Sequence, residues 1–104
     1  MGIERITRSL LVVLGVLIGA HKEDVELHGW AIIKKTGLRG PTVYRVLDRL
    51  EDAEWLTSRW EDDPEPGRPR RRLYRLTPHG CAAGTALLSQ RRSQHFILGW
   101  QGAQ

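Results

Sequence analysis

The stretch that decides the fold spans residues 27–50 and reads LHGWAIIKKTGLRGPTVYRVLDRL. Its first part, residues 30–36, has the apolar spacing of a short helix. Gly37 ends this helix, because glycine adopts the left-handed conformation of a helix C-terminus without a steric penalty. Gly40 and Pro41 restart the chain, since proline suits the first position of a helix. This order predicts two helices joined by a tight turn.

The second helix of the pair is predicted over residues 41–53. Val43, Val46, Leu47 and Leu50 recur at helical spacing, so one face of the helix is apolar and packs on a core. The opposite face is polar and cationic and points to solvent. This outward face is available to another molecule and consists of Thr42, Tyr44, Arg45, Asp48 and Arg49.

Two short segments rich in aromatic and β-prone residues follow, at 55–60 and 72–76, and both are predicted as strands. The loop between them, residues 62–69, contains three prolines and a glycine and cannot pair as a strand. Thr77 and Pro78 then begin a last helix, because threonine caps free amides and proline fits the first turn. The fold class is therefore mainly α with a small β-hairpin, in the order α-α-α-β-wing-β-α of a winged helix-turn-helix.

A chain of 104 residues with 40% apolar composition supports one core, so a single domain is expected over residues 1–104. The helix-turn-helix and wing occupy residues 27–76. Residues 1–20 supply an N-terminal helix, starting at residue 4, that is apolar on all faces and must be buried on more than one side. Residues 77–98 supply a C-terminal helix. The N-terminal helix is expected to pack partly on its own domain and partly on a second copy of the chain, and both helices are expected to contribute to the dimer interface through Leu10, Leu14, Leu17, Leu87 and Leu88.

The cationic side chains cluster where the helix-turn-helix would meet a polyanion. The net charge of the chain is +4, and five cations against one anion over residues 34–49 account for +4 in that window alone. Such clustering favours DNA, whose major groove admits one helix that reads base edges. The candidate contacts are Arg39, Thr42, Tyr44, Arg45 and Arg49 on the recognition helix, Lys34 and Lys35 on the helix before it, and Arg68, Arg70, Arg71 and Arg72 in the wing.

Several of these candidates have a plainer structural interpretation. Val43 could meet a thymine methyl group, but core packing is the preferred interpretation. The Tyr44 hydroxyl could be hydrogen-bonded inside the domain. The wing arginines follow an acidic run, residues 61–65, and could form a solvated charge cluster.

The sequence lacks the residue sets that metal sites and catalysis need. Cys81 is the only cysteine and the four histidines are scattered, so neither an internal disulfide nor a metal site is expected. No catalytic triad pattern and no glycine-rich phosphate loop occurs, so no enzyme activity and no cofactor are expected. Residues 10–20 follow Arg5 and Arg8 in a pattern similar to a signal peptide, but a core helix explains this run and it is too short to span a bilayer. We expect a cytoplasmic protein without a membrane partner.

Seven segments resemble, in order, the PadR family of winged-helix transcriptional repressors: LHGW at 27–30, GL at 37–38, TVY at 42–44, LDRLE at 47–51, WE at 60–61, GRPR at 67–70 and YRLTP at 74–78. The resemblance covers about residues 8–92 and is strongest to the short subgroup with a single helix after the wing. It implies a homodimer built by the N- and C-terminal helices, whose paired recognition helices read a palindromic operator. It also implies that Tyr44 binds phosphate and that Arg68 or Arg70 reaches the backbone or minor groove.

Members of this family often lose DNA on binding a small aromatic effector, and Phe96 and Trp100 are the candidate residues for an effector pocket between subunits. A tail that packs on the first helix is the alternative. Three residues depart from the family pattern: Pro41 replaces a common glycine, Arg45 a common proline, and Glu54 a glycine after the third helix. The operator sequence therefore cannot be transferred, and Glu54 would be strained in a left-handed conformation.

The sequence thus predicts a sequence-specific DNA-binding transcriptional regulator, a dimeric repressor that acts by promoter occlusion. The alternative is a winged-helix module for protein interaction or architecture that does not read an operator. The acidic run before the wing favours this alternative slightly, because its anions would repel phosphate.

Overall fold

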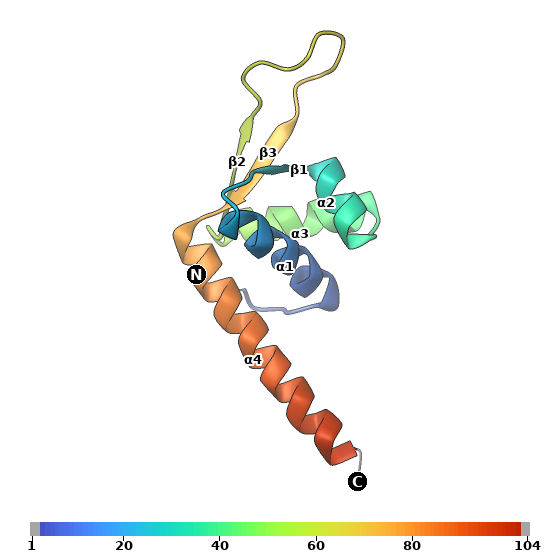
Figure 1. Ribbon diagram of the computed structural model, residues 1–104, viewed down its shortest axis with the longest axis vertical. Coiled ribbons are helices and arrows are strands. Elements are labelled where there is room, and N and C mark those ends of the chain that lie inside the picture. The colour runs from blue at the N-terminus through green and yellow to red at the C-terminus, as the bar shows by residue number, and fades with distance from the viewer. Residues whose placement is uncertain (1–2, 103–104) are drawn as a thin grey trace.

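Four helices and three strands make up the fold in the computed structural model, which describes the backbone of residues 3–102 and the side chains of residues 3–92 (Figure 1). The elements in chain order are α1 (Arg8–Lys22), β1 (Leu27–His28), α2 (Gly29–Thr36), α3 (Gly40–Asp52), β2 (Leu56–Trp60), β3 (Arg72–Leu76) and α4 (Pro78–Gly102). The predicted fold class, mainly α with a small β-hairpin, is confirmed.

Helix α1 begins at Arg8, later than the predicted start at residue 4. Thr7 caps the helix, because its backbone is extended and its hydroxyl accepts a hydrogen bond from the Leu10 amide at 3.1 Å. The helix ends at Lys22, two residues after its predicted end at residue 20. Asp24 then turns the chain with a left-handed φ of 57°. The apolar spacing that begins before Thr7 therefore includes residues outside the helix.

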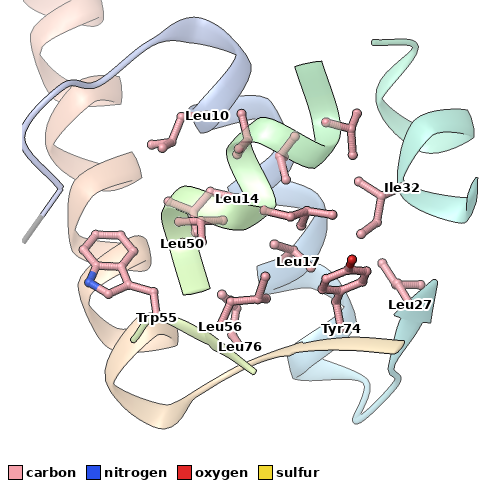
Figure 2. Packing of buried hydrophobic residues seen from close by; sticks show 14 of the residues in the cluster. Leu10, Leu14, Leu17, Leu27, Ile32, Leu50, Trp55, Leu56, Tyr74 and Leu76 are labelled. Atoms are coloured by element: carbon pink, nitrogen blue, oxygen red, sulfur yellow. The ribbon is translucent and has the colours of Figure 1, made fainter. Parts of the chain in front are cut away.

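Leu10, Leu14 and Leu17 lie inside the core of their own chain, with at most 1% of each side chain exposed. Helix α1 packs against α2, α3, β3 and α4, and these leucines occupy the face between them (Figure 2). This differs from the prediction that the three leucines bind a second copy of the chain. A side chain that is already buried has no apolar surface left to offer a partner.

Helices α2 and α3 form the predicted helix-turn-helix. Gly37 ends α2 with a φ of 73°, and its amide donates to the Ile33 carbonyl at 2.8 Å. Helix α3 starts at Gly40 with Pro41 in its first turn. Val43 has no exposed surface, so its interpretation as a core residue is confirmed. The whole predicted apolar face of α3 is buried, namely Val43, Val46, Leu47 and Leu50.

The sheet has the strand order β1-β3-β2 and is antiparallel throughout. Strands β2 and β3 are the predicted hairpin, whereas β1 was not predicted. In β1, Leu27 pairs with Tyr74 and His28 pairs with Leu73. A strand of two residues is too short to show the alternation of apolar and polar residues that predicts a strand. Its pairing depends on the free edge of β3, which exists only in the folded chain. Because β1 leads directly into α2, it places the start of α2 beside the wing.

The turn after α3 has the strained backbone predicted for it. Glu54 has a left-handed φ of 63°. Its amide donates to the Glu51 carbonyl at 2.9 Å, and the Trp55 amide donates to the Leu50 carbonyl at 2.9 Å. These bonds satisfy the carbonyls at the end of α3 and turn the chain into β2.

Helix α4 starts where the sequence predicts, because the Thr77 hydroxyl accepts a hydrogen bond from the Gly80 amide at 2.9 Å. Gly80 lies so close to Trp55 that an added Cβ would be 2.0 Å from the Trp55 carbonyl oxygen. The helix continues to Gly102, past its predicted end at residue 98, and its second half extends away from the other elements (Figure 1). Over the described residues, no helix has the length and apolar character to cross a bilayer.

Candidate nucleic-acid interface

The face of α3 opposite the core carries most of the predicted base-reading residues. Tyr44 and Arg45 are exposed, and Thr42 is half-buried one turn earlier. Arg39 is exposed at the N-cap position and makes no side-chain cap bond. Arg45 is therefore the cation that the middle of α3 presents to solvent.

The remaining predicted cations do not line the surface between α3 and the wing. Arg49 is half-buried and lines a hollow with Thr42 and Arg45, where its guanidinium donates to the carbonyl of Arg5 in the segment before α1. Lys34 and Lys35 are exposed in the last turn of α2. Lys35 lines a hollow against α1, together with Gly19, and does not face the wing.

Tyr44 lies across the start of α2, and Gly29 makes room for it. A Cβ on Gly29 would be 2.3 Å from the Tyr44 hydroxyl oxygen and 2.8 Å from two ring carbons. The Tyr44 side chain is 45% exposed, and its hydroxyl has no hydrogen-bond partner among the described residues. The first amides of α2 are unpaired within the helix and favour an anion at the same place. The role of Gly29 has no signal in the sequence, because it depends on the contact with Tyr44 in the folded chain.

His28 caps α2, although histidine is not among the residue types that signal a helix start in a sequence. Its Nδ1 accepts a hydrogen bond from the Ala31 amide at 3.2 Å. Burial lowers the pKa of His28 from its ordinary value, nearby Arg71 and Arg68 lower it further, and Glu61 opposes them. The ring is therefore neutral at physiological pH, with its proton on Nε2 and its Nδ1 free to act as the cap.

A hollow of about 380 Å³ opens between α2, α3 and the base of the wing, and we call it the α2–wing hollow. Three exposed aromatic side chains line it: Trp30 is 61% exposed, Tyr44 45% and Trp60 56%. Exposed aromatic rings beside guanidinium groups are typical of surfaces that bind another molecule. The other lining residues are His28, Gly29, Arg70, Arg71, Arg72 and Tyr74.

Arg71 and Arg72 lie at the base of the wing and line this hollow. The Arg72 guanidinium is 5.2 Å from the centroid of the Trp60 ring, and its Nε donates to the Ser58 hydroxyl at 3.0 Å. The electron-rich face of the indole attracts this cation and holds it in place. Arg71 is exposed, and its guanidinium has no partner within the described part of the chain. Arg71 is thus available to an external anion.

Arg68 and Arg70 are both held by Glu61, in different ways. The Arg68 guanidinium forms an ion pair with the Glu61 carboxylate at 2.9 Å, and only 24% and 22% of the two side chains are exposed. The hydrogen bond from Arg68 lowers the pKa of Glu61, and the same bond raises the pKa of Arg68. Arg70 is exposed, and one of its guanidinium nitrogens donates to the Glu61 carbonyl at 2.8 Å. The charge of Arg68 is therefore largely compensated inside the wing, whereas Arg70 still faces solvent.

The residues predicted for a dimer and an effector are on α4. Leu87 and Leu88 are half-buried and pack against the core, with a Leu88 methyl carbon 4.0 Å from the Cβ position of Gly15. Phe96 and Trp100 fall within the helical range of α4, and their side chains lie outside the described residues.

Comparison with known proteins identifies the family. The family model of the transcriptional regulator PadR-like family matches residues 16–86, which is more than half of the chain. The chain belongs to the PadR-like family of transcriptional regulators. The match runs from the middle of α1 into α4 and includes every residue that lines the α2–wing hollow of this PadR-like regulator.

Solved structures share the fold of this PadR-like regulator. A PadR family transcriptional regulator from Eggerthella lenta has a TM-score of 0.71 at 23% identity, over 86% of this chain and 80% of that one. A PadR family transcription regulator from Clostridium difficile has a TM-score of 0.66 at 21% identity, over 93% and 97%. A mutant of MepR from S. aureus has a TM-score of 0.67 at 29% identity, over 92% and 66%. The curated proteins contain no match to the chain.

Proposed function

We propose that this PadR-like regulator binds duplex DNA sequence-specifically in the cytoplasm and represses transcription, as a dimer, by occupying a promoter. One observation carries the proposal: Tyr44 of α3 lines the same hollow as Arg70 and Arg71 of the wing. Tyr44, on the outward side of the recognition helix, therefore lies beside the exposed cations of the wing. A helix and an adjacent wing on one side of a domain can contact the same duplex.

We expect the residues on this surface to make two kinds of contact, with base edges and with phosphates. Arg45 projects from the middle of α3, with Arg39 and Thr42 near its start, and these side chains would read base edges in the major groove. Tyr44 and the wing arginines would contact phosphates, which position the protein without carrying sequence information. Arg71 and Arg70 are the wing residues best placed for this role, because their guanidinium groups are exposed.

The dimer in this proposal forms through α4. The second half of α4 projects from the domain (Figure 1) and contains an apolar stretch in the sequence, residues 96–98. Paired with the same helix of a second copy, together with Leu87 and Leu88, it would place two α3 helices on successive turns of a palindromic operator. A small aromatic effector that binds near Phe96 and Trp100 would then change the spacing of the two α3 helices and release the DNA.

Selection from a random duplex library, followed by affinity measurements, tests the proposal. The wild-type protein is expected to enrich an inverted repeat, and its affinity is expected to fall steeply with salt because phosphate contacts release counterions. Arg45→Ala should relax base preference at one position of each half-site. Arg70→Ala should weaken the selected and random duplexes to the same degree and reduce the salt slope by about one. Equal losses on both duplexes for Arg45→Ala would count against its base-reading role.

The alternative, a winged-helix module that binds protein rather than an operator, drew its support from the acidic run. In the structure, Glu61 of that run is paired with Arg68, and Asp62 contacts Arg59 at 3.4 Å. The charge of Glu61 is therefore compensated within the chain, whereas Asp62 is 88% exposed and shares Arg59 with Glu26, so the expected repulsion of phosphate is reduced mainly at Glu61. Absence of binding to random duplex at low salt would favour this alternative.

A further inference from the structure

Glu61 forms hydrogen bonds with three of the four arginines predicted for the wing, namely Arg68, Arg70 and Arg71. We infer that Glu61 is a positioning residue, which holds the arginines of the wing in the arrangement that meets DNA. The inference rests on the proposed DNA-binding function. It assigns a favourable role in binding a polyanion to a residue that is itself an anion.

The contacts of Glu61 use its backbone and its side chain. Its amide donates to the Arg71 carbonyl at 2.8 Å, and its own carbonyl accepts from the Arg70 guanidinium at 2.8 Å. Its carboxylate accepts from the Arg68 guanidinium at 2.9 Å and from the Arg71 amide at 3.4 Å. Glu61, directly after β2, is therefore bonded to three residues of the segment before β3, namely Arg68, Arg70 and Arg71.

The rest of the wing loop has few other bonds that could do this. Three of the residues at 62–69 are prolines, which have no amide to donate. The loop turns at Gly67, with a φ of 82°, and the Arg68 amide donates to the Glu65 carbonyl at 3.2 Å. Among the described residues, the side-chain contacts that join this loop to the strands are the pair of Arg68 with Glu61 and the pair of Asp62 with Arg59. Without the Glu61 carboxylate, the loop would lose the more buried of these two contacts.

Electrostatics alone predicts the opposite effect of removing Glu61. Replacing an anion near a DNA-binding surface by a neutral residue raises the net charge and should raise the affinity for a polyanion. Loss of positioning lowers the affinity, because the segment that carries the wing arginines would lose the bonds of the carboxylate to the Arg68 guanidinium and the Arg71 amide, and would have to be ordered at the moment of binding. The sign of the change therefore separates a positioning role from a simple charge effect.

The experiment compares Glu61 with Asp63, an exposed acid in the same loop that has no ion pair in the described part of the chain. Fluorescence anisotropy would measure binding to a labelled random-sequence duplex and to the duplex that the wild-type protein enriches from a library. Glu61→Ala is expected to bind both duplexes about tenfold more weakly than wild type. The affinity of Glu61→Gln should lie between those of wild type and Glu61→Ala, since the glutamine amide oxygen can still accept from Arg68. Asp63→Asn and Asp63→Ala should bind both duplexes more tightly than wild type.

Backbone amide hydrogen exchange of the free protein gives a second measurement that needs no DNA. The Arg71 amide should exchange faster in Glu61→Ala than in wild type, and at the wild-type rate in Asp63→Ala. Unchanged exchange of Arg71 in Glu61→Ala would overturn the inference, as would a Glu61→Ala protein that binds DNA as tightly as wild type. If the wild-type protein binds neither duplex at low salt, the proposed function itself fails and the inference fails with it.

Discussion

Replacing Gly29 by alanine is expected to weaken DNA binding without destabilising the fold. The added Cβ would lie 2.3 Å from the Tyr44 hydroxyl oxygen, whereas ordinary contact begins at 3.4 Å, so the end of the Tyr44 ring must move by about 1 Å. Tyr44 is exposed and can swing into solvent, which relieves the clash. The movement takes the hydroxyl away from the start of α2, where we propose that it meets a phosphate.

The two free energies affected by this change have opposite signs. A hydrogen bond from a hydroxyl to a charged phosphate contributes about 1.5 kcal/mol, so its loss should lower DNA affinity roughly tenfold. Gly29 is helical and lacks the left-handed φ that would make alanine strained there. Alanine in place of a glycine stabilises a helix interior by about 0.5–1 kcal/mol, and Gly29 is the first residue of α2, so the gain there is at most of this size. The free energy of unfolding should therefore stay the same or increase.

Fluorescence anisotropy on the selected duplex and thermal unfolding by circular dichroism would measure these two quantities. Gly19→Ala is the matched control, because Gly19 is also helical and an added Cβ there meets no atom within 4 Å. It should leave DNA affinity unchanged. Tyr44→Phe should lose as much affinity as Gly29→Ala, and the double variant should lose no more, since both changes remove one contact. Full affinity in Gly29→Ala, or additive losses in the double variant, would refute the reasoning.

Two further predictions concern stability. The pKa of His28 lies below its ordinary value of 6.5, so the stability that neutral His28 provides is present above pH 6.5 and is lost as pH falls through the folded-state pKa. His28→Asn keeps a capping oxygen, so its melting temperature should fall less on acidification than that of wild type. Identical pH profiles of melting temperature for wild type and His28→Asn would contradict this. Gly80→Ala places a Cβ 2.0 Å from the Trp55 carbonyl oxygen and should lower the free energy of unfolding by about 2–3 kcal/mol in urea titrations. Gly84→Ala is the milder comparison, because its Cβ would meet a side-chain atom of Leu14 at 3.0 Å and no backbone atom, and an equal cost for both variants would show that the contact with Trp55 relaxes easily.

The elements that could be predicted from the sequence are those whose signals are local. The apolar spacing of α3, the stop at Gly37 and the cap at Thr77 each depend on residues within a turn or two, and all three are observed. Apolar spacing alone places the start of α1 too early, because it continues back past Thr7, whereas the Thr7 cap sets the start at Arg8. Strand β1 could not be found in this way, since it exists only as a partner of β3.

For the proposed interface, the sequence alone is sufficient to predict the cations and Tyr44 as candidate DNA contacts, because charge clustering and helical periodicity are local properties of the sequence. Which of these side chains are free to act depends on contacts between segments that are distant in the chain. In the folded chain, Arg68 pairs with Glu61, and Arg49 bonds to the segment before α1. The Tyr44 ring lies against Gly29. Such contacts are set by packing in three dimensions, which leaves no periodic trace in the sequence.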